Sequence, residues 1–192
     1  MPFIESIVSQ INDRILEKVS STKAIFSIRG VSRQLPRVED TIPAYVDDSG
    51  EGEFNAFDDD YSVCVYHKAE TMTYSPEEGG TFGDKVDLQK ETANMSLLCW
   101  ADRSRIKVTQ EALASAIASA FPYTVDKEFK KDRNISGVAI EISSVDNNSI
   151  GVWSREFQGI AYALPPESIY FQISYRIETI YDKDCLEICE EC

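Results

Sequence analysis

The feature that most constrains the fold is a run of alternating side chains near the C-terminal end, SIYFQISYRIETIY over residues 168–181. Ile169, Phe171 and Ile173 begin an apolar set at every second position, and Gln172 and Ser174 belong to the polar set between them. A period of two places the two sets on opposite faces of a β-strand. Because this strand is much longer than the usual five or six residues, we expect it to lie in the interior of a sheet.

Two amphipathic helices and a long hairpin are predicted before it. Residues 3–19 repeat apolar side chains at three- and four-residue spacings, which indicates a helix with one buried face. Residues 109–121 form a second helix with Thr109 as its N-cap. A strand over 61–67, with a candidate continuation over 70–74, and a strand over 86–101 are joined by a segment rich in Gly and Pro, which predicts an antiparallel hairpin with an exposed tip.

Further strands complete the predicted sheet. They cover residues 23–29, 42–46 and 137–143. Residues 150–164 fit either a helix on which Trp153 and Phe157 share a face, or a strand over 159–164. The order of elements predicts an α+β fold, a mostly antiparallel sheet with helices packed on one face and a long hairpin. One such domain is expected over residues 1–182, followed by a tail rich in Cys and Glu over residues 183–192.

The charge of the chain argues against several functions. The formal net charge is −14, and residues 39–100 hold 15 acidic residues against 3 basic ones. A protein this acidic repels phosphate at long range, so sequence-specific binding of nucleic acid is not expected. No apolar run is long enough to cross a membrane, and the first residues lack the basic region of a secretory signal, which predicts an intracellular protein.

Half of the residues in the segment 47–60 are Asp or Glu. Clustered carboxylates suit a calcium ion, but the alternating Asp positions, central Gly and distal Glu of an EF-hand loop are not met. We therefore expect a solvated or interface loop here.

Reactive side chains form no catalytic motif in the sequence. His67 is the sole histidine, and it stands at a strand end without an acid or nucleophile partner nearby in the sequence. No phosphate-binding, dinucleotide-binding or metalloprotease pattern occurs. We expect no catalytic residue, no cofactor and no bound metal, and hence a protein that is not an enzyme.

Five cysteines are present, of which Cys64 and Cys99 lie in apolar strand runs and are expected to be small buried hydrophobes. Cys185, Cys189 and Cys192 have the spacing of the cluster motif of radical S-adenosylmethionine enzymes, without the repeating βα units that follow it there. A three-thiolate zinc site is a second alternative. We favour an ordinary mobile tail over both.

The C-terminal third carries a resemblance to a known family. It rests on the runs VWSREFQG over 152–159, ALPP over 163–166 and YFQISYRIE over 170–178. These runs resemble head–tail joining and tail terminator proteins of tailed bacteriophages, in which a hydrophobic and acidic segment precedes a proline break and a long closing strand. The N-terminal helix, the sheet with a long hairpin and the Ala-rich helix before a proline are similar too.

The resemblance implies a structural virion protein, assembled in the host cytoplasm, that forms a ring at the neck or tail top. Its copies would form a hexamer or dodecamer that joins head and connector to tail, contacting neck, connector or tail-tube proteins. DNA would pass through the channel without specific binding, and no membrane is involved. The candidates for interface or lumen residues lie in the acidic loop and the hairpin tip: Asp47, Asp48, Glu51, Glu53, Asp58, Asp59, Asp60, Glu77, Glu78 and Phe82. The alternative function is an acidic, non-viral adaptor or immunity-type protein that binds a basic partner.

Overall fold

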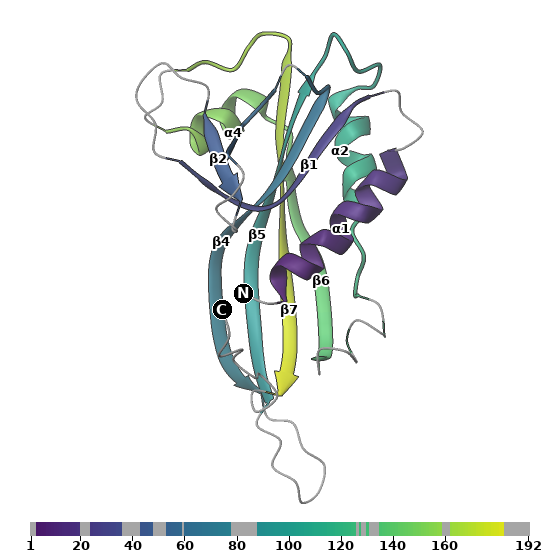
Figure 1. The fold of residues 1–192 in the computed structure, drawn as a ribbon, viewed down its shortest axis with the longest axis vertical. Helices are drawn as coiled ribbons and strands as arrows, with labels where there is room; N and C mark the ends of the chain where they lie inside the picture. The colour runs from purple at the N-terminus through teal and green to yellow at the C-terminus, as the bar shows by residue number, and fades with distance from the viewer. Residues whose placement is uncertain are drawn as a thin grey trace, which may run out of the picture.

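The fold consists of one long sheet with helices on both of its faces. The computed structural model describes residues 3–19, 24–35, 43–47, 53–58, 60–77, 88–125, 127, 130, 135–158 and 162–182. Its main elements are α1 (Ile4–Val19), β1 (Phe26–Gln34), β2 (Ala44–Asp47), β3 (Glu53–Asn55), β4 (Val63–Glu77), β5 (Leu88–Asp102), α2 (Gln110–Ala118), β6 (Ile135–Asp146), α4 (Ser149–Glu156) and β7 (Ser168–Asp182). Figure 1 shows the long strands side by side along the molecule, with the helices over their upper and middle parts.

The seven strands form a single sheet in the order β3-β2-β1-β4-β5-β7-β6. β1 and β4 are parallel, and every other pair of neighbours is antiparallel. β5 and β7 pair along their whole length and lie inside the sheet. The predicted α+β class with a mostly antiparallel sheet is confirmed, as are the long hairpin, formed by β4 and β5, and the interior position of β7.

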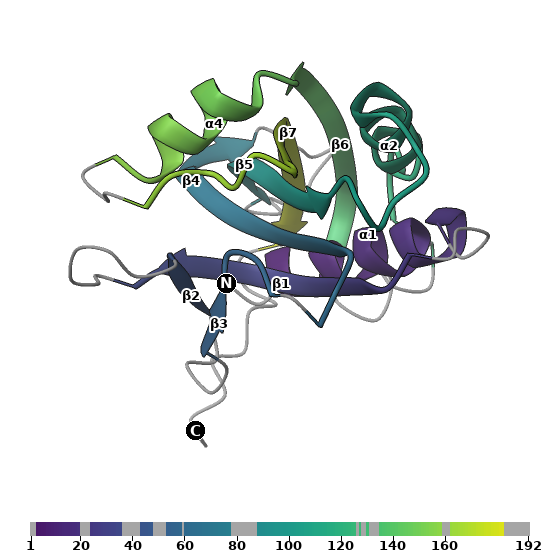
Figure 2. The ribbon, with the colours of Figure 1, turned by 90° about the horizontal axis from the view of Figure 1, so that it is seen from above.

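The strands carry two cores, one on each face. On β5, Ala93, Met95 and Leu97 point to the face that α1 and α2 cover, which we call the α1 face. Leu98 and Trp100 point to the opposite side, the α4 face, where a second core lies. Figure 2 shows α4 on the other side of the long strands from α1 and α2. The prediction that the helices pack on one face is therefore wrong for α4, whose Val152 and Trp153 belong to the second core.

α1 is held to the sheet by its apolar stripe. Six side chains on one side of the helix are at most 3% exposed: Ile4, Ile7, Val8, Ile11, Ile15 and Val19. Full burial of a side chain of this size stabilises a protein by about 1.5–3 kcal/mol. The helix predicted over residues 3–19 is thus confirmed, and it packs on the sheet as its pattern requires.

α2 begins at the predicted cap and ends before the predicted stop. The Thr109 Oγ1 accepts a hydrogen bond of 3.2 Å from the Ala112 amide, as an N-cap does. The helix was expected to continue to Phe121, but the regular turns end at Ala118. Phe121 precedes a proline, which disfavours the helical conformation, and its amide donates instead to the Ala118 carbonyl three residues before, at 3.2 Å.

α4 settles the segment that the sequence left open between a helix and a strand. Asn148 caps it, with its Oδ1 accepting from the Gly151 amide at 3.1 Å. Trp153 and Phe157 lie together in the second core, with ring centroids 4.3 Å apart. None of the described helices is both long and apolar enough to span a membrane.

Part of the segment predicted as an acidic loop is a strand, which corrects that expectation. Residues 53–55 form β3 and pair with β2. The Phe54 ring stacks on the Tyr45 ring at 5.8 Å, and Phe57 is 6% exposed and lies against Trp100 at 5.2 Å. These aromatic side chains anchor the segment to the second core in spite of the surrounding carboxylates.

Candidate functional site

The sole histidine is held on both sides in the core. The His67 Nδ1 lies 2.7 Å from the Tyr175 hydroxyl, and its Nε2 lies 2.8 Å from the Asn12 Oδ1. The Asn12 Nδ2 donates to the Arg29 carbonyl at 3.0 Å, so its Oδ1 is the acceptor and the His67 Nε2 carries the proton. The Arg29 carbonyl is available because the β1–β4 register shifts between Ile28 and Val31.

In this arrangement the His67 side chain links neighbouring elements through hydrogen bonds and is not placed as a reactive group. The side chain is fully buried, and burial lowers its pKa to about 3. Both ring nitrogens are engaged by α1 and β7, so the neutral ring ties these elements to β4. The sequence pattern placed His67 at a strand end, which is wrong, because the residue lies inside β4. The sequence gave no sign of its partners either, because Asn12 and Tyr175 are far from it along the chain.

A second polar network is buried between α4, β2 and β4, and sequence reasoning missed it. Glu156 is the last residue of α4. Its carboxylate accepts a hydrogen bond from the Tyr45 hydroxyl at 2.7 Å and forms an ion pair with Lys68 at 2.9 Å. The Tyr66 and Tyr170 hydroxyls are hydrogen-bonded to each other, and burial raises both of their pKa values. With Tyr45, Tyr66 and Tyr170 fully buried, the network fastens α4 to the sheet.

Beyond the second core, the α4 face of the long strands is mostly polar, and no described helix covers it. Its polar members, which we call the polar face, are Thr71, Thr73 and Ser75 of β4, Lys90, Thr92 and Asn94 of β5, Arg176 and Glu178 of β7, and Glu141 of β6; the apolar Leu88, Ile180 and Ala139 lie among them. Each of these side chains is exposed or half-buried.

The polar face is ordered in rows that cross the strands. One row runs through Thr71, Asn94, Arg176 and Glu141, which are direct neighbours in the sheet register. The Asn94 Nδ2 donates to the Thr71 Oγ1 at 2.8 Å, and the Arg176 Nη2 donates to the Glu141 Oε2 at 2.9 Å. Cross-strand pairs of this kind stabilise a sheet without apolar cover.

Among the described residues, a strand on each side of the polar face lacks a strand neighbour on its outer side. β1 pairs with β4 only as far as His67, so in the described part of the chain the rest of β4 has a strand neighbour on one side alone. Of the described strands β6 pairs with β7 alone, but its outer side is not free throughout, since the Ile140 amide donates to the Tyr123 carbonyl at 3.0 Å. Unpaired edges present free amides and carbonyls that another strand can bind.

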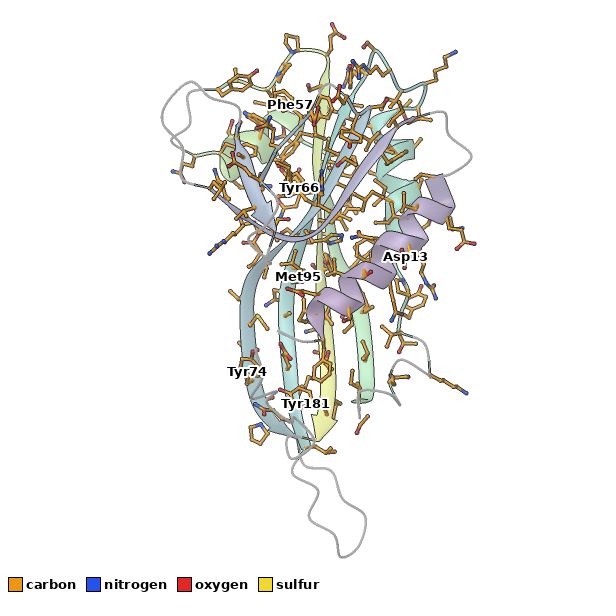
Figure 3. All side chains as sticks on the ribbon, in the orientation of Figure 1. Asp13, Phe57, Tyr66, Tyr74, Met95 and Tyr181 are labelled. Carbon is orange, nitrogen blue, oxygen red and sulfur yellow. The ribbon has the colours of Figure 1, made fainter. Side chains whose placement is uncertain are left out.

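The position of a proline shows which amides of β4 point outward. Proline has no N–H and is tolerated in edge strands where that side faces away from the ladder. Pro76 lies within β4, so its nitrogen points away from β5. Because the backbone repeats every two residues, the amides of Tyr74 and Met72 point outward too. Figure 3 shows Tyr74 on this edge, far below Tyr66.

The structure separates the two regions predicted as interface or lumen. Asp58 and Asp60 precede β4 and Glu77 is its last residue, so the 15 residues of the strand, about 50 Å, lie between them. Asp58 is partly buried, and its Oδ1 accepts from the Asp60 amide at 2.9 Å. Glu53 lies on β3 and is exposed.

The remaining candidates are described only in part. Asp47 ends β2 and Glu77 ends β4, and of both only the backbone is described. The others lie outside the described residues: Asp48, Glu51, Asp59, Glu78 and Phe82.

In the part of the chain that the structure describes, no three His, Cys, Asp or Glu side chains lie close enough together to hold a metal ion. Cys64 and Cys99 are buried free thiols, as predicted. The cysteines of the tail, Cys185, Cys189 and Cys192, lie outside the described residues, as does the whole segment 183–192.

Comparison with known proteins assigns no family to this geometry. No family model matches the chain, and no curated protein matches its sequence significantly.

Proposed function

We propose that this protein is a structural subunit of a particle like that of tailed bacteriophages, and that its copies join side by side into a ring at the neck or tail top. The ring surrounds the channel through which DNA passes and links head and connector to tail. The observation that carries the proposal is that, among the described residues, the lower part of β4 and the whole of β6 each lack a strand neighbour on their outer side, on opposite sides of the polar face.

The strand directions favour lateral joining of copies. β4 is antiparallel to β5, β5 to β7 and β7 to β6, so β4 runs opposite to β6. In a ring whose axis follows the strands, every copy points the same way. The β4 edge of one copy therefore meets the β6 edge of the next as an antiparallel pair, the pairing that prevails within this sheet.

The surroundings of the two edges are suited to such a contact. A hollow of about 630 Å³ lies beside β6, lined among others by Phe121, Tyr123 and Ile140. Tyr74 stands on the β4 edge with 56% of its surface exposed, and it lies on the α1 face, to which Ile140 of this hollow also belongs. In the joined arrangement, the hollow receives side chains of the adjoining β4 strand.

The test is the mass of the purified protein in solution, measured by native mass spectrometry for the wild type and two variants. We expect a hexamer or dodecamer for the wild type. Tyr74→Pro removes an outward amide and the ring of the tyrosine, whereas Tyr74→Ser removes the ring and keeps the amide. The proline variant should assemble less than the serine variant, with both folded by circular dichroism.

A wild-type chain that stays monomeric at every concentration, with or without phage neck proteins, would contradict the proposal. If the two variants assembled equally, the outward amide of β4 would not take part in the contact between copies. A tight one-to-one complex with a basic protein, without self-assembly, would favour the acidic adaptor instead.

A further inference from the structure

A buried carboxylate near the start of β5 lacks a partner. Glu91 is 4% exposed and points to the α1 face, as Ala93 does two residues further on, and its Oε1 has no hydrogen-bond partner among the described residues. Directly opposite in the sheet register stands Thr179 of β7, which is fully buried and whose Oγ1 has no described partner either. Direct neighbours on one face have Cβ atoms about 5 Å apart, so the two unpartnered atoms belong to one place in the fold.

Two tyrosines stand beside this pair of residues. Tyr74 is the neighbour of Glu91 on β4, and its hydroxyl donates a hydrogen bond to the carboxylate. Tyr181 is the next residue of β7 on the same face, and burial and the negative charge of Glu91 raise the pKa of its hydroxyl. The Tyr181 ring contacts the Phe3 ring, with centroids 5.3 Å apart. Figure 3 shows Tyr74 and Tyr181 near the lower ends of β4 and β7. Aromatic side chains therefore flank the carboxylate on both neighbouring strands.

The neighbouring strands supply no cation for this carboxylate. Their adjoining positions on the α1 face are occupied by Met72, Tyr74, Pro76, Ile177, Thr179 and Tyr181. Lys90 precedes Glu91 on β5, but it points to the opposite face and pairs with Glu178 at 3.0 Å. Burial raises the pKa of Glu91, and the positive charge that acts against this rise is the ammonium of the amino terminus. Because a buried carboxylate without a cation costs stability, this position favours a positively charged group.

An ammonium group fits the atoms that are present. It has three N–H donors and no acceptor, so it can donate to the Glu91 Oε1 and to the Thr179 Oγ1 at once. Tyr74 and Tyr181 offer aromatic rings, which attract a cation. A divalent metal fits less well, because it prefers several carboxylate and carbonyl oxygens. Among the described residues, Glu91 has no two further His, Cys, Asp or Glu side chains close enough to complete such a site.

We propose that Glu91 and Thr179 form a binding site for an alkylammonium group, flanked by Tyr74 and Tyr181. This inference goes beyond the proposed ring and does not depend on it. Two sources present the same chemistry: the amino terminus of the chain itself, and an amine or lysine side chain of another molecule. Both are covered by one experiment, in which the charge of the amino terminus is either kept or removed.

The experiment measures the melting temperature at pH 7 in methylammonium chloride and in potassium chloride, each at about 100 mM. The wild type and Glu91→Gln are prepared with a free and with an acetylated amino terminus. Acetylation removes the terminal charge, so in the acetylated wild type the site is open to the added probe. Acetylated Glu141→Gln, changed at a side chain 69% exposed on the opposite face, is the control, and acetylated Thr179→Val tests the hydroxyl.

We expect methylammonium to raise the melting temperature of the acetylated wild type by about 3–6 °C above its value in potassium chloride. A well-placed probe of this size binds with a Kd of about 10 mM. About 100 mM therefore shifts the folding equilibrium about tenfold, which corresponds to this rise in a chain of this length. Glu141→Gln should show the same rise, Thr179→Val a smaller one and Glu91→Gln none. In the acetylated wild type, the amide signals of Glu91 and Thr179 in nuclear magnetic resonance should move as the probe is added.

The samples with a free amino terminus assign the source of the ammonium group. If acetylation lowers the melting temperature of the wild type but not that of Glu91→Gln, the terminus occupies the site. If acetylation affects both proteins alike, the group comes from another molecule. A rise no larger than in potassium chloride, an equal rise in Glu91→Gln, or amide signals that stay in place would overturn the inference and favour a bridging water or a bound proton as the partner of the two atoms.

Discussion

Acidification should unfold this protein through its single histidine. In the folded state burial holds the pKa of His67 at about 3, whereas an unfolded histidine has a pKa of about 6.5. Between these values the unfolded chain binds a proton that the folded chain does not. The contribution of His67 to the free energy of unfolding is therefore fully present above pH 7 and is lost as the pH drops toward 3.

The magnitude follows from the gap between the two pKa values. Each unit is equivalent to about 1.4 kcal/mol, so the full loss at pH 3 is about 5 kcal/mol. At pH 5 the unfolded histidine is protonated and the folded one is not, and the loss is about 2 kcal/mol. This is a large part of the stability of an ordinary domain.

The assay is urea denaturation between pH 7.5 and pH 5, compared with His67→Gln. Glutamine keeps one donor and one acceptor but does not titrate, so carboxylates shift both proteins alike and the difference isolates the histidine. The wild type should lose about 2 kcal/mol more than the variant over this range. If both proteins lose the same stability, or if nuclear magnetic resonance shows the folded ring titrating near pH 6, then His67 is not held neutral by burial.

Two further predictions concern buried carboxylates. Glu156→Gln should lower the free energy of unfolding by about 1–3 kcal/mol, because it takes the charged acceptor from the Tyr45 hydroxyl and from Lys68, whereas Glu167→Gln at the surface should change it by less than about 0.5 kcal/mol. A loss no larger than that of the control would deny the network a role in stability. Glu91 is 4% exposed, its Oε1 has no hydrogen-bond partner among the described residues, and burial raises its pKa. Because a raised carboxyl pKa costs stability as the pH rises through it, Glu91→Gln should raise the melting temperature more at pH 8 than at pH 4, and a variant destabilised equally at both would contradict this.

Local patterns predicted the elements that bury one clear face. The stripe of α1 and the alternation of β7 are visible in the sequence because each residue set keeps one environment along the element. β3 was missed because two aromatic residues, Phe54 and Phe57, decide its placement against a majority of carboxylates around them. The surroundings of His67 and Glu156 were beyond reach, since their partners come from strands and helices distant in the sequence.

The polar face illustrates a different limit of sequence reading. Along β5 the positions facing α4 change from Leu98 and Trp100 to Asn94, Thr92 and Lys90, while the period of two continues unchanged. Alternation alone assigns residues to faces, but it does not say how far a covering helix extends. The change of residue type along one face is the signal that marks where the cover ends.

The lengths of the elements explain why that cover ends where it does. α4 has 8 residues and spans about 12 Å, whereas β5 has 15 residues and spans about 50 Å. The helix therefore covers only one end of the α4 face, and Figure 1 shows the long strands continuing below the helices. Polar rows on that extension bury little apolar surface on their side, so they add little to the stability of a lone subunit. The length of these strands below the helices is therefore not explained by apolar burial on the α4 face, and the apolar side chains on their α1 face, such as Ala93 and Met95 of β5, contribute the burial there.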